Sequence, residues 1–145
     1  MDDLDRKIVI ELEKNGRTSY KDIAKKLKVS DGAIRFRTRK MIQKNILRIT
    51  ASVNPFSLEN SILALIGMEL ERRTHKETME TISKLRGVVS VCNATGRHDL
   101  LVEVFLNSQK ELNKFLMEDL SKIGGIKATE TFVYLDAINK WVEMC

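Results

Sequence analysis

The stretch 20–39 reads YKDIAKKLKVSDGAIRFRTR, and it decides the fold expected for the start of the chain. It holds two runs with helical apolar spacing joined by a short turn, and Ser30 stands where it can cap the second helix. Ala24 is small where the two helices would cross, Val29 would fill the turn, and Ile34 would anchor the second helix in a core. The stretch therefore predicts a helix-turn-helix, a unit whose second helix can enter the major groove of DNA.

The segments on either side complete a winged helix-turn-helix domain over residues 1–53. A first helix is expected because apolar residues recur at every fourth position, at Leu4, Ile8 and Leu12. The third helix is expected over 31–44, with Asn45 in the left-handed conformation that ends it. Residues 47–53 alternate apolar with small or polar side chains, which predicts a strand after the third helix.

The third helix carries the residue types that bind DNA. Arginine can bridge the acceptors of guanine and pair with phosphates, and a helix start with a bare Gly32 lets backbone amides approach a phosphate. The candidate DNA-binding residues are Ser30, Gly32, Ala33, Arg35, Phe36, Arg37, Arg39 and Lys40. Residues 1–60 hold 14 Lys and Arg against 8 Asp and Glu, a net charge of +6, whereas residues 61–145 hold 11 against 12. This asymmetry favours a polyanionic partner for the first half, and the alternative is a three-helix bundle with a solvated basic face.

Composition restricts the class of protein. The 145 residues make one large domain or two small ones, and no apolar run approaches the roughly 20 residues of a membrane span. The acidic start of the chain argues against a secretory signal. Two cysteines, Cys92 and Cys145, cannot build a disulfide framework or a four-thiolate zinc site, so we expect a reducing, cytoplasmic location and no metal. Cys92 lies in an apolar run and is expected in the core.

The only proline, Pro55, lies in a turn-rich stretch over 54–60, which we interpret as a linker. The second domain would then span 61–145. Its pattern reads strand, helix, strand, strand, helix, strand, over 62–70, 77–86, 88–95, 100–106, a helix that begins after Ser108, and 126–135. This is the ferredoxin-like βαββαβ order, so the fold class is α+β.

The strand that begins at Ile62 is apolar at consecutive positions through Ile66, so both of its faces need cover. Two helices can cover only one face of such a sheet. Leu63 and Leu65 on the other face therefore predict a dimer interface, most simply with a second copy of the chain.

The motifs together resemble the leucine-responsive/AsnC family of bacterial and archaeal regulators, also called feast/famine regulatory proteins. Residues 4–8 match its opening LDxxI, and Ile46 and Asn54-Pro55 match its GxIxxY…NP segment. Residues 23–41 match its IAxxLGLSxxxVxxRxxxL pattern, with Lys28 in place of the turn glycine and Thr38 in place of an apolar residue. Residues 95–100, TGRHDL, are similar to its TGxxD turn. The lysine would give the corner a slightly different backbone, and the threonine hydroxyl must find a carbonyl if it is buried.

The resemblance implies a regulator that binds double-stranded DNA and a free amino acid as effector, and no cofactor. It implies that the turn lies at a contact between dimers, which assemble to tetramers or octamers, and a nucleoid-associated place in a prokaryotic cytoplasm. The effector-binding residues implied in this way are Gly96, Arg97, His98, Asp99, Leu100, Thr129 and Thr131. Asp99 would receive the α-ammonium group, whereas on residue chemistry alone the glycine and aspartate would serve a tight hairpin turn equally well.

Two other functions stay open from the sequence. An architectural protein would bind and bend DNA with little sequence preference. A small enzyme of amino-acid metabolism could share the ferredoxin-like unit, but no Ser-His-Asp, Cys-His or paired-carboxylate arrangement is evident, and we expect no catalytic residues.

Overall fold

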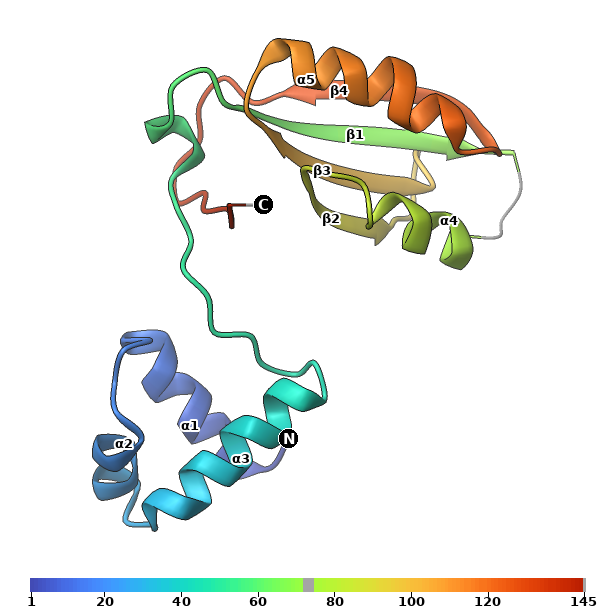
Figure 1. The fold of residues 1–145 in the computed structure, drawn as a ribbon. Coiled ribbons are helices and arrows are strands. Elements are labelled where there is room, and N and C mark those ends of the chain that lie inside the picture. The colour runs from blue at the N-terminus through green and yellow to red at the C-terminus, as the bar shows by residue number, and fades with distance from the viewer. Residues whose placement is uncertain (72–74, 145) are drawn as a thin grey trace. The chain divides into compact units, whose positions relative to one another are not determined.

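The computed structural model describes residues 1–71 and 75–144, so Cys145 lies outside the described residues. Contacts divide the chain into two units, Met1–Thr50 and Ala51–Cys145 (Figure 1). The first unit consists of α1 (Asp3–Lys14), α2 (Tyr20–Leu27) and α3 (Asp31–Gln43), which confirms the three helices expected there.

Each of these helices begins at a residue that caps it. The Asp2 side chain accepts the N–H of Asp5, and the Asp5 side chain accepts the N–H of Asp2, which makes a complete capping box. Ser19 and Ser30 accept N–H groups in the first turns of α2 and α3, and the cap at Ser30 is the one predicted above. The helix boundaries therefore follow from local chemistry.

The corner of the helix-turn-helix keeps the backbone that glycine would adopt. Lys28 ends α2 with φ 56° and ψ 43°, in the left-handed region, so the expectation of a different backbone was wrong. This conformation is sterically unfavourable for lysine. It is compensated because the Lys28 N–H then donates to the last carbonyls of α2. Asn45 also has a positive φ of 53°, as expected.

The core of the first unit is formed by one face of each helix. Its buried apolar residues are Ile8, Leu12, Ile23, Ala24, Ile34 and Met41. Thr38 is fully buried among the described residues, and its hydroxyl has no hydrogen-bond partner there. The expectation that this hydroxyl finds a carbonyl was therefore wrong, and its desolvation is uncompensated.

The strand expected over 47–53 does not form. Val53 alone makes an isolated antiparallel bridge, with Val142, and residues 47–52 belong to no strand in the described part of the chain. An alternating pattern needs a neighbouring strand to pair with, and within the described residues only Val53 of this stretch makes a β-bridge. The expected linker over 54–60 contains a short 3-10 helix, η1 (Pro55–Ser57), and lies in the second unit.

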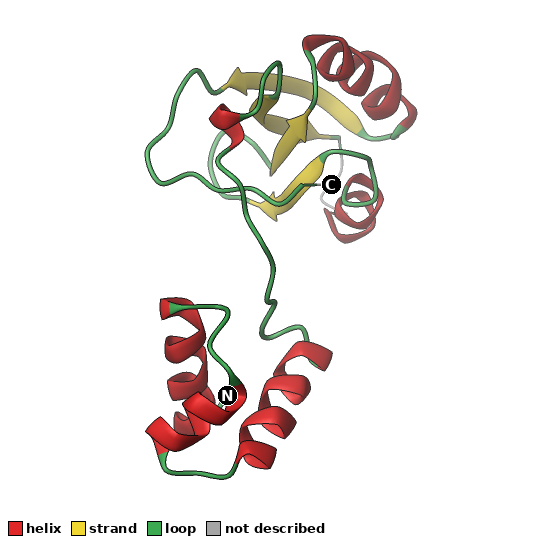
Figure 2. Ribbon diagram, turned by 60° about the vertical axis from the view of Figure 1, so that its left-hand side comes forward, coloured by secondary structure: helices red, strands yellow, loops and turns green. Residues whose placement is uncertain are grey.

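The second unit is a four-stranded antiparallel sheet in the order β2-β3-β1-β4, which confirms the ferredoxin-like topology. Its elements in chain order are β1 (Ile62–Leu70), α4 (His75–Ile82), β2 (Val88–Asn93), β3 (Leu100–Leu106), α5 (Gln109–Lys114), η2 (Phe115–Asp119), η3 (Leu120–Lys122) and β4 (Ile126–Val133). Both α-helices lie on one side of the sheet (Figure 2). Ile82, Leu112 and Phe115 from the helical segments pack there against the strands.

The other face of the sheet is partly covered by the chain's own C-terminal segment. Leu63 is only 3% exposed, because it clusters with Phe105 and Val142. The expectation that Leu63 stays open for a partner was therefore wrong for a single chain. Leu65 is only half-buried and pairs in register with Phe132, which is 46% exposed. This face is thus closed around Leu63 and open around Leu65.

Cys92 is exposed, so its expected place in the core was also wrong. It lies on β2, which is an edge strand of the sheet, and the burial pattern of β2 shows that its side chains are at most half-buried. An apolar run predicts a strand but not whether the strand is central or peripheral.

Replacing Thr38 with valine should stabilise the first unit. The two side chains have the same shape, so the change removes an unpartnered buried hydroxyl without leaving a cavity. We expect a gain of about 1 kcal/mol in the free energy of unfolding, measured by urea titration. Thr18→Val is the matched control, because the Thr18 hydroxyl donates to the Asn15 carbonyl at 2.8 Å, and that variant should lose stability. A less stable Thr38→Val variant would show that the hydroxyl does have a partner.

Candidate DNA-binding face and ligand turn

The outward face of α3 carries cations around one aromatic ring. Arg35, Phe36, Arg39 and Lys40 are all exposed. The Arg35 guanidinium lies 3.2 Å from an Asp31 carboxylate oxygen and 5.5 Å from the centre of the Tyr20 ring. The Lys40 ammonium lies 5.9 Å from the centre of the Phe36 ring. These contacts orient Arg35 and Lys40, and all four side chains stay exposed.

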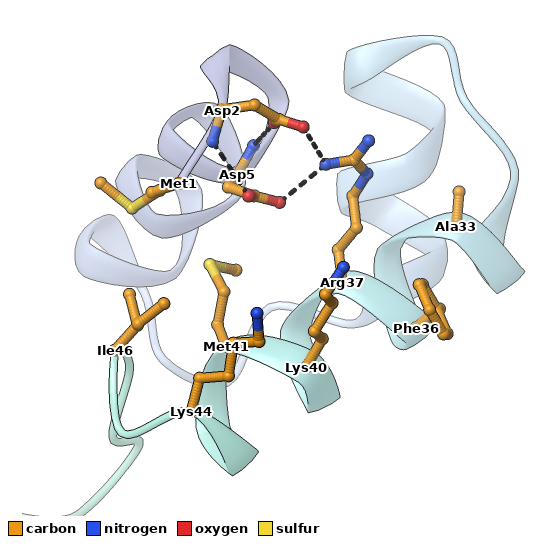
Figure 3. A pocket seen from close by; sticks show the side chains of 10 residues that line it. All are labelled: Met1, Asp2, Asp5, Ala33, Phe36, Arg37, Lys40, Met41, Lys44 and Ile46. Carbon is orange, nitrogen blue, oxygen red and sulfur yellow. Dashed lines mark hydrogen bonds and ion pairs between the residues drawn. The ribbon is translucent and has the colours of Figure 1, made fainter.

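Arg37 has a different place from the other candidate DNA-binding cations. Its guanidinium donates hydrogen bonds to the carboxylates of Asp2 and Asp5, with 2.9 Å between Nη1 and Asp5 Oδ1 (Figure 3). The Arg37 hydrogen bond lowers the pKa of the Asp5 carboxyl, and the Asp5 backbone N–H lowers that of Asp2, with Arg37 adding to it. Arg37 therefore joins α3 to the start of α1, a contact that the sequence pattern could not reveal.

A pocket of about 400 Å³ opens beside this ion-pair cluster. Figure 3 shows Met1 and Ile46 on one side of it, and Ala33, Phe36 and Lys40 along α3. Its lining mixes thioether, aliphatic, aromatic and charged groups.

The start of α3 is open to an approaching backbone. A Cβ atom built on Gly32 would meet no atom within 4 Å, so the space in front of this residue is empty. The Ser30 hydroxyl already accepts the Ala33 N–H at 3.2 Å. Ser30 thus caps the helix, and the Ala33 N–H is already hydrogen-bonded to this cap.

The turn between β2 and β3 is attached to the end of β1 through Asp99. The Asp99 N–H donates to the Met68 carbonyl at 2.9 Å, and the Asp99 carboxylate accepts the Leu70 N–H at 2.8 Å. Gly96 adopts a φ of +127°, which side chains rarely allow, and has open space around it. Asp99 therefore shapes the turn, and its negative charge lies at the end of the central strand β1.

His98 folds back over Gly67, on the face of the sheet opposite the two helices. Its Nε2 lies 2.9 Å from Glu130 Oε2 on β4, and Arg97 lies 3.6 Å from the same oxygen. The imidazole is 13% exposed, and its Nδ1 is buried without a hydrogen-bond partner among the described residues. The ring occupies the space that a side chain at Gly67 would need. Sequence reasoning missed Gly67 and Glu130, although a glycine inside a strand signals close approach of another group.

Three other predicted effector residues are not gathered with His98 in the single chain. Thr129 and Thr131 pair in register with Met68 and Ile66, whose side chains point to the helix-covered face, whereas Glu130 pairs with Gly67 on the opposite face. Leu100 is fully buried in the core. The structure thus brings together Arg97, His98 and Asp99 near the end of β1, and not the threonines.

Among the described residues, no group of three His, Cys, Asp or Glu side chains lies close enough together to hold a metal ion. No helix in residues 1–71 and 75–144 has the length and apolar character needed to cross a membrane.

Comparison with known proteins assigns both units. Residues 1–42 match the AsnC-type helix-turn-helix domain, and residues 63–141 match the Lrp/AsnC ligand binding domain. A helix-turn-helix-type transcriptional regulator of Pyrococcus furiosus is 38% identical over 142 residues, which cover 97% of this chain and 95% of that protein.

Solved structures share the fold. AsnC of E. coli aligns with a TM-score of 0.73 and 29% identity, over 94% of this chain and 93% of its own. A transcriptional regulator of Neisseria meningitidis, solved as a complex with L-Met, aligns with a TM-score of 0.71 and 23% identity, over 97% and 93%. Since both family domains match in order and a close relative matches end to end, the chain belongs to the Lrp/AsnC family of transcriptional regulators.

Proposed function

We propose that this regulator binds specific double-stranded DNA through α3 and that a free amino acid, bound near the 95–100 turn, adjusts its assembly or its DNA binding. The observation that carries the proposal is the exposed row of cations on α3, in the unit that matches the AsnC-type helix-turn-helix domain. Phosphates attract such a row without regard to sequence, and side chains that reach base edges add specificity.

Within the predicted DNA-binding set, the residues divide by role. Arg35, Arg39 and Lys40 present their charges outward, and Gly32 and Ala33 leave room for a phosphate or a base edge. Arg37 is better explained as a positioning residue, because its guanidinium is held by two carboxylates of the same unit. Ser30 supports the start of the helix.

An amino-acid effector fits the chemistry of the turn. The Asp99 carboxylate offers a charge to an ammonium group, and the open backbone at Gly96 offers N–H groups to a carboxylate. The Neisseria relative was solved with L-Met, which is consistent with an amino acid as the class of ligand. Thr129 and Thr131 lie on the other face of the sheet, so the proposed site in a single chain does not include them.

Assembly into a homodimer, and from dimers into tetramers or octamers, accounts for the apolar surface of the second unit. Six large apolar residues in the described C-terminal part of this unit are exposed: Phe132, Val133, Leu135, Ile138, Trp141 and Met144. Phe132 pairs in register with the half-buried Leu65, and a second copy of the chain would cover this apolar surface. The regulator would act in the cytoplasm on chromosomal DNA, and not as an enzyme.

An architectural role with low sequence preference is the alternative for the same surface. The two are separated by comparing affinity for a selected site and for random DNA across salt concentrations. A specific regulator keeps a preference of about a thousandfold or more for its site, whereas an architectural protein binds both alike.

Removing the Arg39 side chain should weaken specific DNA binding. Arg39 is exposed and makes no ion pair within the described residues, so Arg39→Ala should leave the fold intact. We expect a loss of about 1–3 kcal/mol on the selected site if Arg39 reads a base, and Arg35→Ala should act similarly. Arg6→Ala removes the same charge from α1 and is the control. Equal affinities of all three variants and the wild type would exclude α3 as the reader.

Neutralising Asp99 should abolish the response to the effector. Asp99→Asn keeps an oxygen that can accept the Leu70 N–H, so the turn should fold, but the charge that would attract an ammonium is lost. A thermal-shift screen of the twenty amino acids first identifies the ligand, and calorimetry then compares the variants. We expect Asp99→Asn to bind the amino acid at least about tenfold more weakly than wild type. Asp136→Asn, an exposed control, should bind it with unchanged affinity. Unchanged affinity would leave Asp99 with a purely structural role.

A charge on the open face of the sheet should break the dimer. Leu65→Glu places a carboxylate where a partner would exclude water, at a cost of several kcal/mol. Sedimentation velocity of the full chain should show wild-type dimers or larger species and Leu65→Glu monomers with an unchanged circular dichroism spectrum. Met117→Glu, on the outer side of η2, is the control, since Met117 is 77% exposed and lies away from this face. A monomeric wild-type protein at tens of micromolar would contradict the proposal.

A further inference from the structure

Phe36 is exposed in the middle of the cationic face of α3, and the core of the unit does not use it. Its side chain is 66% exposed, whereas Ile34, Thr38 and Met41 supply the buried face of the same helix. Figure 3 shows Phe36 beside Ala33 and turned away from the cluster of Arg37, Asp2 and Asp5. An aromatic ring in this position exposes apolar surface to water, which is unfavourable unless another group covers the ring.

The neighbours of Phe36 on the helix leave one side of the ring open and place charge on the other. One turn earlier stand Gly32 and Ala33, and nothing occupies the space in front of Gly32. One turn later stand Arg39 and Lys40, with the Lys40 ammonium 5.9 Å from the ring centre. On α3 itself, Phe36 is thus an exposed ring flanked by cations, and the exposed Met1 and Ile46 lie across the pocket that Phe36 also lines.

This combination matches one feature of duplex DNA. The 5-methyl group of thymine is the apolar group that base edges present in the major groove, and the phosphates on both sides of the groove are anionic. An apolar surface that fits a protein partner would need several adjacent apolar residues. The other exposed apolar residue of α3, Ile42, lies six positions on, roughly 240° around the axis at 3.6 residues per turn.

We propose that Phe36 is a specificity-determining residue of this regulator, and that its ring contacts the 5-methyl group of a thymine in the major groove. Lys40 holds the ring from one side and pairs with the adjacent phosphate, and the Ala33 methyl group adds a second apolar contact. The protein therefore selects T·A over C·G at that base pair, because cytosine carries no methyl group there. The inference rests on the proposed DNA binding by α3 and adds which chemical group of the base is read.

The test starts with the full-length wild-type protein, which selects binding sites from a random duplex library. Each thymine of the selected site is then replaced singly by deoxyuridine, which lacks only the methyl group. Wild type should bind about fourfold more weakly when the contacted methyl is removed. Phe36→Ala should bind the thymine site about tenfold more weakly than wild type does, and should bind the thymine and uracil sites equally.

Three further variants make the result specific to the ring. Phe36→Leu keeps an apolar side chain and should keep the preference for thymine over uracil. Ile42→Ala removes an exposed apolar group from another side of α3 and should keep the affinity and the preference. Arg39→Ala should lose affinity but retain the preference. Circular dichroism and urea titration establish that each variant is folded.

The outcomes separate this inference from the proposed function. Specific sites with no sensitivity to uracil at any position, or a Phe36→Ala variant that keeps the wild-type preference, would overturn the methyl contact while leaving DNA regulation standing. A wild-type protein that selects no site and binds no DNA would overturn both. Loss of the thymine preference in Phe36→Ala alone supports the inference.

Discussion

The ion pair between Arg37 and the two carboxylates of Asp2 and Asp5 determines how α3 can be used. It holds the side of the helix that borders the core, since Arg37 lies between the buried Ile34 and Met41. The helix is thereby fixed to α1 by charge as well as by packing. Its opposite side, which carries Phe36, Arg39 and Lys40, makes no packing contribution to the unit and is available to a ligand.

In the second unit, the strand on which the other elements depend is β1. This strand pairs with β3 on one side and β4 on the other, and its two faces meet different surroundings. Ala64, Ile66 and Met68 face the helices. On the opposite face, Leu63 packs against the C-terminal segment, Leu65 stays partly open, and Gly67 lies under the His98 ring. The absence of a side chain at Gly67 lets the turn bring His98 to Glu130. The missing side chain at Gly67 thus leaves room for the His98 ring of the 95–100 turn.

The sequence predicts the features that depend on neighbouring residues. Serine and aspartate caps, the periodicity of α1 to α3, and the glycine-containing turn are all encoded within a few positions, and the elements form close to their expected bounds. The ion pairs of Arg37 join residues more than 30 positions apart, and no local pattern indicates them. The same reason explains why the exposure expected for Leu63 and the burial expected for Cys92 were wrong. Their burial depends on where the C-terminal segment runs and on which strand forms the edge of the sheet.

The left-handed Lys28 has a consequence for the motion of the first unit. A non-glycine residue in this conformation costs about 1–2 kcal/mol, and the strain is released when the end of α2 unwinds. This helix has only eight residues, too few to be stable without its tertiary contacts. We therefore expect α2 to open more readily than α1 and α3, and its amides to exchange with solvent deuterium ahead of theirs. Binding to a duplex would slow this exchange, so that recognition is accompanied by a loss of conformational entropy concentrated at the corner.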